Sequence, residues 1–341
     1  MTISPLLPTC TAPPAVSVII PTYNRATVLI AAVESVLSQT WKDYELIVID
    51  DGSTDDTRSR LDVYMRAIRY VYQPNAGVSA AQNKGIALAR GAWVSILASD
   101  DVWLPTKLET QLRAIALLGD EFGACFTDCT YVGDPRLTQS MFERAGFRPD
   151  SGLGECCDAM RLSLQAFPAA CVQSLLIRSS LLREIDGFDE NLAVAEDADL
   201  IFRLCLKTRF CFVSERLVKI DATPSVPRLT NLIAHKSDQV FASYEYRYRK
   251  WLALSGYGSA VRNEILVQLS QLYYDWMTSS LTRLSARTLL AKWRELRRLD
   301  ISGRAITATL CGRAAAKAAR SLRRLRRRSI NASREYLRSG A

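Results

Sequence analysis

Short apolar runs alternate with longer segments of helical periodicity along the first hundred residues. The apolar runs cover 16–21, 44–50, 68–72 and 93–97. Between them, the segments 26–39 and 77–90 repeat apolar residues at the three- and four-residue spacing of a helix face, and we predict a further helix over 55–66. Continuous apolar runs are typical of parallel strands buried on both faces, and the intervening helices are long enough to cross over. The pattern therefore predicts an α/β fold with a mostly parallel sheet flanked by helices.

The pattern becomes less regular after residue 101. We predict helices over 107–118, 179–184 and 196–207, strands over 124–131 and 171–177, and an irregular stretch over 138–170. Helical periodicity dominates beyond residue 233, in the segments 237–254, 260–281, 286–299 and 305–337. The predicted organisation is a flexible leader over 1–15, an α/β domain over 16–230 and a helical C-terminal region over 231–341.

Composition excludes several classes of protein. No apolar run reaches the 18 residues that a membrane-spanning helix needs. No positively charged segment precedes an apolar stretch near the N-terminus, so we expect no signal peptide and a cytoplasmic location. The nine cysteines are scattered and only one histidine, His235, accompanies them. This composition favours buried free thiols over a disulfide framework or a zinc site.

The net charge of +9 is concentrated at the C-terminal end. Residues 301–341 hold eleven Arg and Lys against a single acid, Glu335, so residues 1–300 are close to neutral. The segment 313–328 interleaves Arg with Leu, a pattern typical of a basic amphipathic helix that contacts an anionic membrane surface. We expect a peripheral contact with the inner leaflet. A solvated helix face is the alternative, and no motif supports nucleic-acid binding.

Paired carboxylates follow two of the predicted strands. Asp50 and Asp51 end the second strand, and Asp100 and Asp101 follow the fourth. Carboxylates gathered at one edge of a sheet need a cation between them, and a divalent metal bound to a nucleotide diphosphate supplies that charge. The Asp51-Gly52 pair by itself is also compatible with a simple turn.

Two common nucleotide-binding classes are excluded by the first loop. The first strand leads into Pro-Thr-Tyr-Asn-Arg, which contains neither GxGxxG nor GxxxxGK[ST]. A nucleotidyltransferase would also need a basic, glycine-rich loop at this position. The sequence therefore favours neither a Rossmann dehydrogenase, nor a P-loop enzyme, nor a nucleotidyltransferase.

Five sequence blocks occur in an order that resembles a known enzyme family. They read VIIPTYNR, ELIVIDDGSTDDT, AGVSAAQNKGIALARG, SDD with WLPTKLE, and GFDENLAVAEDADLIFRL. Over roughly residues 16–220 the chain resembles the inverting family 2 glycosyltransferases of the GT-A fold. The resemblance implies a Rossmann-like GT-A domain with a C-terminal helical extension, a nucleotide-sugar donor (most often UDP-linked), and Mg²⁺ or Mn²⁺ as cofactor.

The resemblance also implies roles for individual residues. Asp197 would be the general base on the acceptor hydroxyl, and Asp101 would be the first choice as metal ligand. Two further residues, Glu196 and Asp199, would shape the acceptor side. The residues expected at the nucleotide are Pro21, Thr22, Tyr23, Arg25, Asp51 and Asp100.

The chain departs from the family pattern at three places. Ala98 stands where the metal motif Asp-x-Asp-Asp often has its first carboxylate, and Gln82 replaces the arginine of a common Ala-Arg-Asn segment. An Arg-x-His element expected after the base is not evident near 219–224, and His235 lies too far on to align with it.

The sequence thus predicts a hexosyltransferase that moves a sugar from a nucleotide-sugar donor to a glycan or lipid-linked saccharide. Cell-envelope or exopolysaccharide biosynthesis is the expected setting, and the mechanism is a metal-assisted single displacement with an Asp base. The alternative, motivated by Ala98 and Gln82, is a catalytically impaired protein of the same fold that binds nucleotide sugars. A nucleic-acid binder acting through the basic tail is a third hypothesis.

Overall fold

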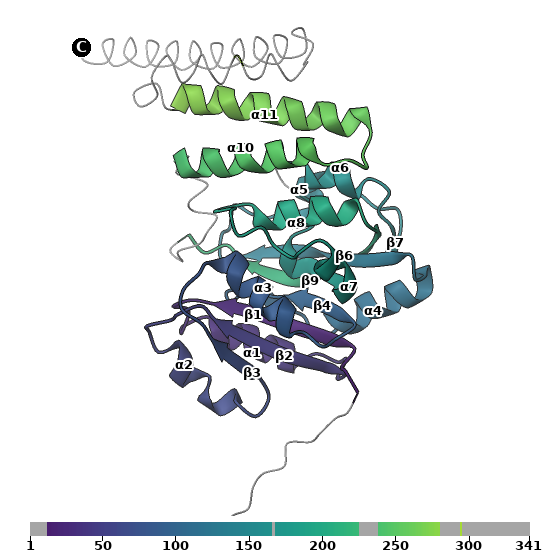
Figure 1. The fold of residues 1–341 in the computed structure, drawn as a ribbon. Helices are drawn as coiled ribbons and strands as arrows, with labels where there is room; N and C mark the ends of the chain where they lie inside the picture. The colour runs from purple at the N-terminus through teal and green to yellow at the C-terminus, as the bar shows by residue number, and fades with distance from the viewer. Residues whose placement is uncertain (1–11, 166–167, 225–237, 280–293, 295–341) are drawn as a thin grey trace, which may run out of the picture. The chain divides into compact units, whose positions relative to one another are not determined.

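A computed structural model describes residues 12–165, 168–224, 238–279 and 294 of the chain (Figure 1). The chain divides into two compact units, Met1–His235 and Lys236–Ala341, and each is described by itself. The predicted leader lies almost wholly outside the described residues. The basic segment 313–328 and the helix predicted over 305–337 lie outside them entirely, and of the helix predicted over 286–299 only residue 294 is described.

Four parallel strands form the first half of the sheet, as the alternating pattern predicts. They are β1 (Val16–Thr22), β2 (Tyr44–Asp50), β3 (Arg69–Tyr72) and β4 (Trp93–Ile96), in the order β3-β2-β1-β4. The register pairs Thr22 with Asp50 and Asp50 with Tyr72, so the carboxyl ends of three strands lie side by side. The loops that follow these strands therefore meet at one edge of the sheet.

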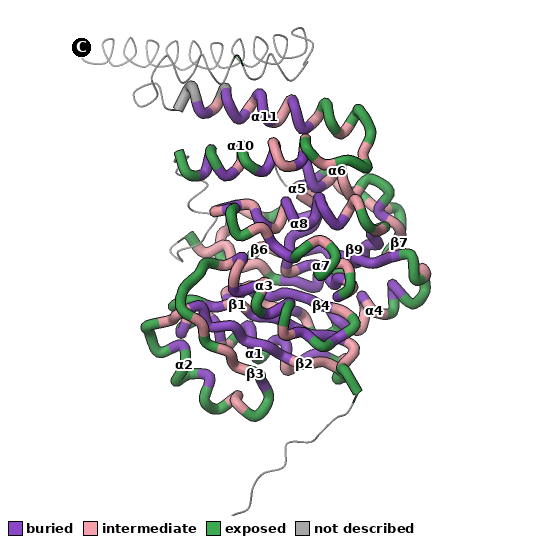
Figure 2. Tube along the Cα trace, in the orientation of Figure 1, coloured by how far each residue is buried: buried purple, intermediate pink, exposed green. Residues whose placement is uncertain are grey.

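Alternate residues of the central strands enter two separate cores. Val18 and Ile20 of β1 pack into one core with α1 (Leu29–Leu37), whereas Ile19 packs into the other with α3 (Val78–Leu88). The central strands are accordingly buried along their length (Figure 2). This two-sided burial explains why these strands read as continuous apolar runs.

The helix predicted over 55–66 is much shorter in the structure. It consists of α2 (Thr57–Arg60) followed by a 3₁₀ turn, η1 (Asp62–Tyr64). Thr57 and Leu61 are its buried residues, and charged side chains surround them. A segment without a broad apolar stripe gains little from packing, which explains its low helical content.

The second half of the sheet is mixed rather than parallel. Here β8 (Leu175–Arg178) runs antiparallel to both β4 and β6 (Phe122–Val132), and β9 (Arg209–Asp221) runs parallel to β6. Two short strands, β5 (Val102–Trp103) and β7 (Leu153–Glu155), pair antiparallel with β9. The prediction of a mostly parallel sheet therefore holds for the first half only, and β5, β7 and β9 were not predicted.

Helices cover the second half of the sheet as well. They are α4 (Lys107–Leu118), α5 (Met141–Ala145), α6 (Ala159–Ser163), α7 (Ser179–Glu184) and α8 (Glu196–Cys205). The stretch expected to be irregular, 138–170, thus contains α5, β7 and α6. A 3₁₀ turn, η2 (Val172–Ser174), occupies the start of the strand predicted over 171–177.

The second unit contains an antiparallel pair of helices, α10 (Asp238–Ala253) and α11 (Ser259–Ser279). Phe241 stacks on Trp276 with ring centroids 5.3 Å apart, and the Trp276 indole donates to Asp238. These contacts between distant positions fix the pairing of the two helices. No helix within the described ranges is long and apolar enough to cross a membrane.

Candidate functional site

The loops after β1 and β2 are joined into one surface at the carboxyl edge of the sheet. The Asn24 backbone N–H donates to Ser53 Oγ at 2.9 Å, and the Asn24 side-chain oxygen Oδ1 accepts from the Thr54 backbone N–H at 2.8 Å. Asn24 has a φ of 51°, a left-handed conformation that asparagine tolerates better than most residues. The structure thus brings together the two polar clusters that the sequence places after the first two strands.

Arg25 lies beside Asp100 at this edge. Their closest nitrogen and oxygen atoms are 3.8 Å apart, and both side chains keep some contact with solvent, 23% for Arg25 and 15% for Asp100. Tyr23 is 46% exposed, Pro21 is half-buried and Thr22 is buried. The Thr22 hydroxyl has no hydrogen-bond partner among the described residues. A cation, a carboxylate and an exposed aromatic ring therefore occupy the position predicted for the nucleotide.

Asp51 points back into the protein. Its Oδ1 accepts from the Gln73 amide at 2.8 Å and from the Ala76 N–H at 2.9 Å, and its Oδ2 accepts from the Gly77 N–H at 2.9 Å. Asp51 is 4% exposed. In this structure the carboxylate thus anchors the start of α3, whereas the sequence predicted a contact with the base or ribose.

The preceding residue, Asp50, also has protein partners. It accepts from the Ser53 N–H and from the Tyr70 hydroxyl, which is 2.7 Å from Oδ2. Burial and this hydrogen bond to a carboxylate raise the pKa of Tyr70. The Asp50-Asp51 pair therefore organises the edge of the sheet through internal hydrogen bonds.

Asp101, expected to bind the metal, is 3% exposed and accepts hydrogen bonds on both carboxylate oxygens. The Asp221 N–H lies 2.9 Å from Oδ1, and the Gln173 amide lies 2.6 Å from Oδ2. The backbone carbonyl oxygen of Gln173 in turn accepts a hydrogen bond from the Trp103 indole N–H. Asp101 thus joins β9 and η2 to the end of β4, and its predicted role as metal ligand stays a prediction.

The described part of the chain contains no group of three or more His, Cys, Asp or Glu side chains arranged to hold a metal ion. Mg²⁺ commonly binds through one or two carboxylates together with substrate phosphates and waters. Asp100, which reaches solvent, fits such a site when a diphosphate provides the remaining oxygens. Ala98 contributes no ligand there.

A buried lysine lies behind this edge. The Lys107 ammonium donates to Ser95 Oγ at 3.0 Å and to Gln111 Oε1 at 2.8 Å, and it lies 4.0 Å from the centroid of the Trp103 ring. Complete burial lowers the pKa of Lys107 to about 7. The sequence analysis did not select Lys107, because a lone lysine at a helix start has no distinguishing pattern.

The acidic cluster predicted near residue 197 occupies the first turn of α8. Ala195 precedes it in a left-handed conformation, with a φ of 60°. Asp197 is half-buried and its Oδ1 accepts from the Ala198 N–H at 2.7 Å, whereas Glu196 is 8% exposed. Of these two acids, Asp197 is the one that reaches solvent more.

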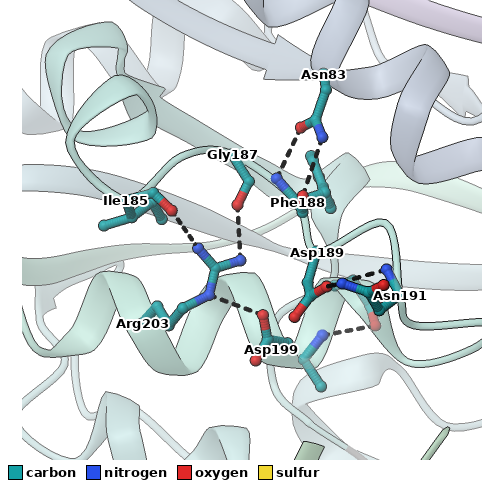
Figure 3. Close-up of polar contacts among 10 residues, drawn as sticks. Asn83, Ile185, Gly187, Phe188, Asp189, Asn191, Asp199 and Arg203 are labelled. Atoms are coloured by element: carbon teal, nitrogen blue, oxygen red, sulfur yellow. Dashed lines mark hydrogen bonds and ion pairs between the residues drawn. The ribbon is translucent and has the colours of Figure 1, made fainter. Parts of the chain in front are cut away.

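Asp199, expected to shape the acceptor side, is buried in this structure. Its side chain is 0% exposed, and Oδ2 forms an ion pair with Arg203 Nε at 2.7 Å (Figure 3). Any effect of Asp199 on the acceptor side would therefore act through Arg203 and the first turn of α8, and that role stays a prediction.

Two residues in this region were missed from the sequence. Asn83 hydrogen-bonds the backbone of Phe188, and the Arg203 guanidinium donates to the carbonyl oxygens of Ile185 and Gly187. For Arg203, the sequence did contain a signal: an arginine stands four residues after Asp199, on a face of α8 that also holds apolar residues. A charged pair at this spacing in an apolar stripe indicates a buried ion pair.

Gln82, the second departure from the family pattern, lies one residue before Asn83 on α3. Its side chain is 3% exposed, and Oε1 has no hydrogen-bond partner among the described residues. A neutral amide therefore occupies the position at which the family pattern has a positive charge.

Known glycosyltransferases are similar to part of this chain. The family model described as glycosyl transferase family 2 matches residues 17–158. An uncharacterized glycosyltransferase of Rickettsia prowazekii is 34% identical over 212 residues, which cover 60% of this chain and 63% of the relative. The uncharacterized glycosyltransferase YibD of Escherichia coli is 41% identical over 129 residues, 37% of each chain. The matched part of the chain thus spans 63% of the first relative's length and 37% of the second's.

Solved structures share the fold. Residues 1–349 of Staphylococcus aureus TarS, in complex with UDP-GlcNAc, match with a TM-score of 0.62 and 18% identity over 82% of this chain and 79% of that one. The mannosyltransferase PcManGT of Pyrobaculum calidifontis, in complex with GDP-Man and Mn²⁺, matches with a TM-score of 0.54 and 17% identity over 92% and 88%. At these identities the similarity establishes the mixed α/β fold of GT-A glycosyltransferases.

Proposed function

We propose that the chain, whose residues 17–158 match the family model of glycosyl transferase family 2, transfers a hexose from a nucleotide-sugar donor to a saccharide hydroxyl with inversion. The observation that carries this proposal is the edge of the sheet where Arg25 lies beside Asp100, next to the exposed ring of Tyr23. A nucleoside diphosphate needs a stacking surface, a positive charge for its phosphates and a carboxylate that can share a metal ion with them.

The diphosphate is the leaving group, so the negative charge that develops on it must be stabilised. We assign this role to Arg25 together with Mg²⁺ or Mn²⁺ held by Asp100. When bound, the metal neutralises diphosphate charge and makes the leaving group better. Pro21, Thr22 and Tyr23 would line the nucleotide pocket, and Asp51 would support it indirectly by anchoring the start of α3.

Asp197 is the proposed general base. A single displacement needs one carboxylate to take the proton from the attacking hydroxyl, whose oxygen forms the bond to the anomeric carbon as the diphosphate leaves. Asp197 is the acid of the α8 first turn that we select, because it is less buried than Glu196 and Asp199. Glu196 would shape the pocket beside it.

The finer parts of the proposal concern the substrates. The TarS complex with UDP-GlcNAc supports a UDP-linked donor, whereas the PcManGT complex with GDP-Man supports a GDP-linked one, and we propose UDP. The acceptor would be a glycan or lipid-linked saccharide of the cell envelope or an exopolysaccharide. The basic tail, 313–328, would hold the protein at the inner leaflet.

Nucleotide binding tests the donor site. Calorimetry with UDP, GDP, CDP and ADP, each with and without Mn²⁺, should show one diphosphate that binds at least tenfold more tightly with Mn²⁺. Asp100→Asn should abolish the Mn²⁺ effect because the amide carries no charge. Asp101→Asn should retain it, since Asp101 holds β9 and η2 rather than the metal.

Asp120→Asn is the matched control, because Asp120 is an exposed aspartate beyond the end of α4. A Mn²⁺ effect that survives in Asp100→Asn but disappears in Asp101→Asn would reassign the metal ligand. Absence of binding for all four diphosphates would contradict the donor site altogether. Binding without any sugar transfer would favour the alternative of a non-catalytic nucleotide-sugar binder, which Ala98 and Gln82 motivate.

A further inference from the structure

We propose that Asn83 and Arg203 are positioning residues that clamp the turn 185–191 between α3 and α8 and so hold Asp197 in place. This inference rests on the proposed function, because it concerns the position of the proposed base. Figure 3 shows the turn held by Asn83 on one side and by Arg203 on the other. Neither residue needs to touch the substrate.

Asn83 binds the turn from α3. Its Nδ2 donates to the Phe188 carbonyl oxygen at 3.0 Å, and its Oδ1 accepts from the Phe188 N–H at 2.8 Å. Nδ2 also lies 2.8 Å from Glu190 Oε1. The amide therefore engages both backbone groups of one residue, which fixes the orientation of the turn as well as its distance from α3.

The approach of Asn83 depends on the absence of a side chain at Gly187. A Cβ built at Gly187 would lie 2.4 Å from Asn83 Oδ1, and the φ of Gly187 is +61°. Asp186, just before it, has a φ of 57°. The left-handed conformation costs glycine nothing but is unfavourable for Asp186 unless surrounding contacts hold it, and the bonds from Asn83 and Arg203 to the adjacent residues supply such contacts.

Arg203 binds the same turn from α8. Its two terminal nitrogens donate to the carbonyl oxygens of Ile185 at 2.6 Å and Gly187 at 2.7 Å, while Nε pairs with Asp199. The guanidinium is thus engaged at all three nitrogens, in a geometry that the single ammonium of lysine cannot reproduce. Asp199, one helical turn away and fully buried, fixes the rotamer of Arg203.

These contacts form a continuous path between the two sides of the proposed site. Asp51 holds the start of α3, Asn83 joins α3 to the turn, and Arg203 joins the turn to α8. The first turn of α8 carries Asp197 two residues after the left-handed Ala195. The position of the base relative to the donor loops is consequently determined by the clamp.

Conservative substitutions in the full-length chain test the clamp. Arg203→Lys keeps the charge opposite Asp199 but loses the double contact with the turn, and Asn83→Asp loses the Nδ2 donor. Arg183→Lys is the matched control, because Arg183 is exposed on α7. The three readouts are the kcat for release of nucleoside diphosphate, the Kd for UDP with Mn²⁺, and amide hydrogen exchange across 195–199.

We expect each clamp variant to lower kcat by roughly 10- to 100-fold, since a displacement of about 1 Å in a reacting group costs this much. The Kd for UDP should stay within about twofold, because Arg25 and Asp100 are untouched. The amides of 195–199 should exchange faster while those of 16–22 do not. The pH–rate profile should shift on its acidic limb, which reports the base.

Wild-type kcat and wild-type exchange at 195–199 in both clamp variants would overturn the inference. So would a parallel loss of UDP binding and kcat, because that pattern indicates general unfolding. If Arg203→Lys does not fold, Asn83→Asp carries the test. Failure of the wild type to turn over any sugar nucleotide would overturn the proposed function instead, and the exchange data would still decide whether the clamp positions α8.

Discussion

Carboxylates of the site differ in what their oxygens bind, and this difference determines which of them can act on a substrate. Asp51, Asp101 and Asp199 use their oxygens to hold α3, β9 and Arg203. Asp100 and Asp197 retain contact with solvent. Our proposal gives metal binding to Asp100 and base catalysis to Asp197 for this reason.

The sequence correctly placed the acidic residues near the ends of strands and at the start of α8. It could not separate ligands from anchors, because the partners of Asp101 lie 72 and 120 residues away in the chain. A side chain's role at such a site depends on long-range contacts. Local pattern carries no information about them.

Lys107 allows a prediction about stability at the residue scale. Its pKa is about 7 in the folded state because of complete burial, below the ordinary value of 10.5. Between these values the unfolded chain binds more protons than the folded one, so the free energy of unfolding rises with pH. We expect a rise of about 1.4 kcal/mol for each pH unit between pH 7 and 8.5, as an upper bound.

Urea unfolding at several pH values measures this effect, and Lys107→Met should remove it. Lys84→Met, at an exposed position of α3, is the control. The quantity to compare is the pH slope of wild type against that of Lys107→Met, because the wild-type curve also contains a contribution from Cys156. Burial raises the pKa of Cys156 to about 12, so its thiol lowers the free energy of unfolding above pH 8.5. Identical pH slopes in wild type and Lys107→Met would show that Lys107 stays charged when folded.

Apolar runs predicted the elements of the first half of the sheet well. Strands β1, β2 and β4 are buried on both faces, and this burial makes them visible as uninterrupted apolar segments. The pattern failed for β9, whose sequence contains the polar stretch Ser214-Glu215-Arg216 at a register shift. It failed for β5 because two residues carry no periodicity.

At the scale of elements, a substitution at Gly187 tests how tightly the turn 185–191 is held between α3 and α8. Gly187→Ala combines a left-handed φ with a Cβ 2.4 Å from Asn83 Oδ1. We expect a loss of about 1–3 kcal/mol in the free energy of unfolding, measured in urea. Gly152→Ala is the control, because a Cβ there meets its nearest neighbour at 4.0 Å. Equal stability of the two variants would mean that the turn adjusts without cost and that the clamp is loose.

At the scale of the whole molecule, the order of the motifs was sufficient to predict the family and the α/β architecture. The match of residues 17–158 to the family model and the mixed α/β sheet agree with that part of the sequence analysis. The mixed second half of the sheet could not be predicted, because β8 pairs antiparallel with β4 and β6 through residues that lie between 49 and 85 positions apart in the chain. The identity of the sugar and the acceptor is equally beyond local pattern.

Turnover of sugar nucleotides tests the central claim most directly. Release of nucleoside diphosphate from UDP-GlcNAc, UDP-glucose, UDP-galactose and GDP-mannose would be measured with Mn²⁺ for the wild type, Asp197→Asn and the control Asp120→Asn. We predict that one donor is turned over, and that Asp197→Asn lowers kcat by roughly 10²- to 10⁴-fold with unchanged diphosphate binding. A wild type that binds a diphosphate yet releases none from any donor, or an Asp197→Asn variant with full turnover, would contradict the account.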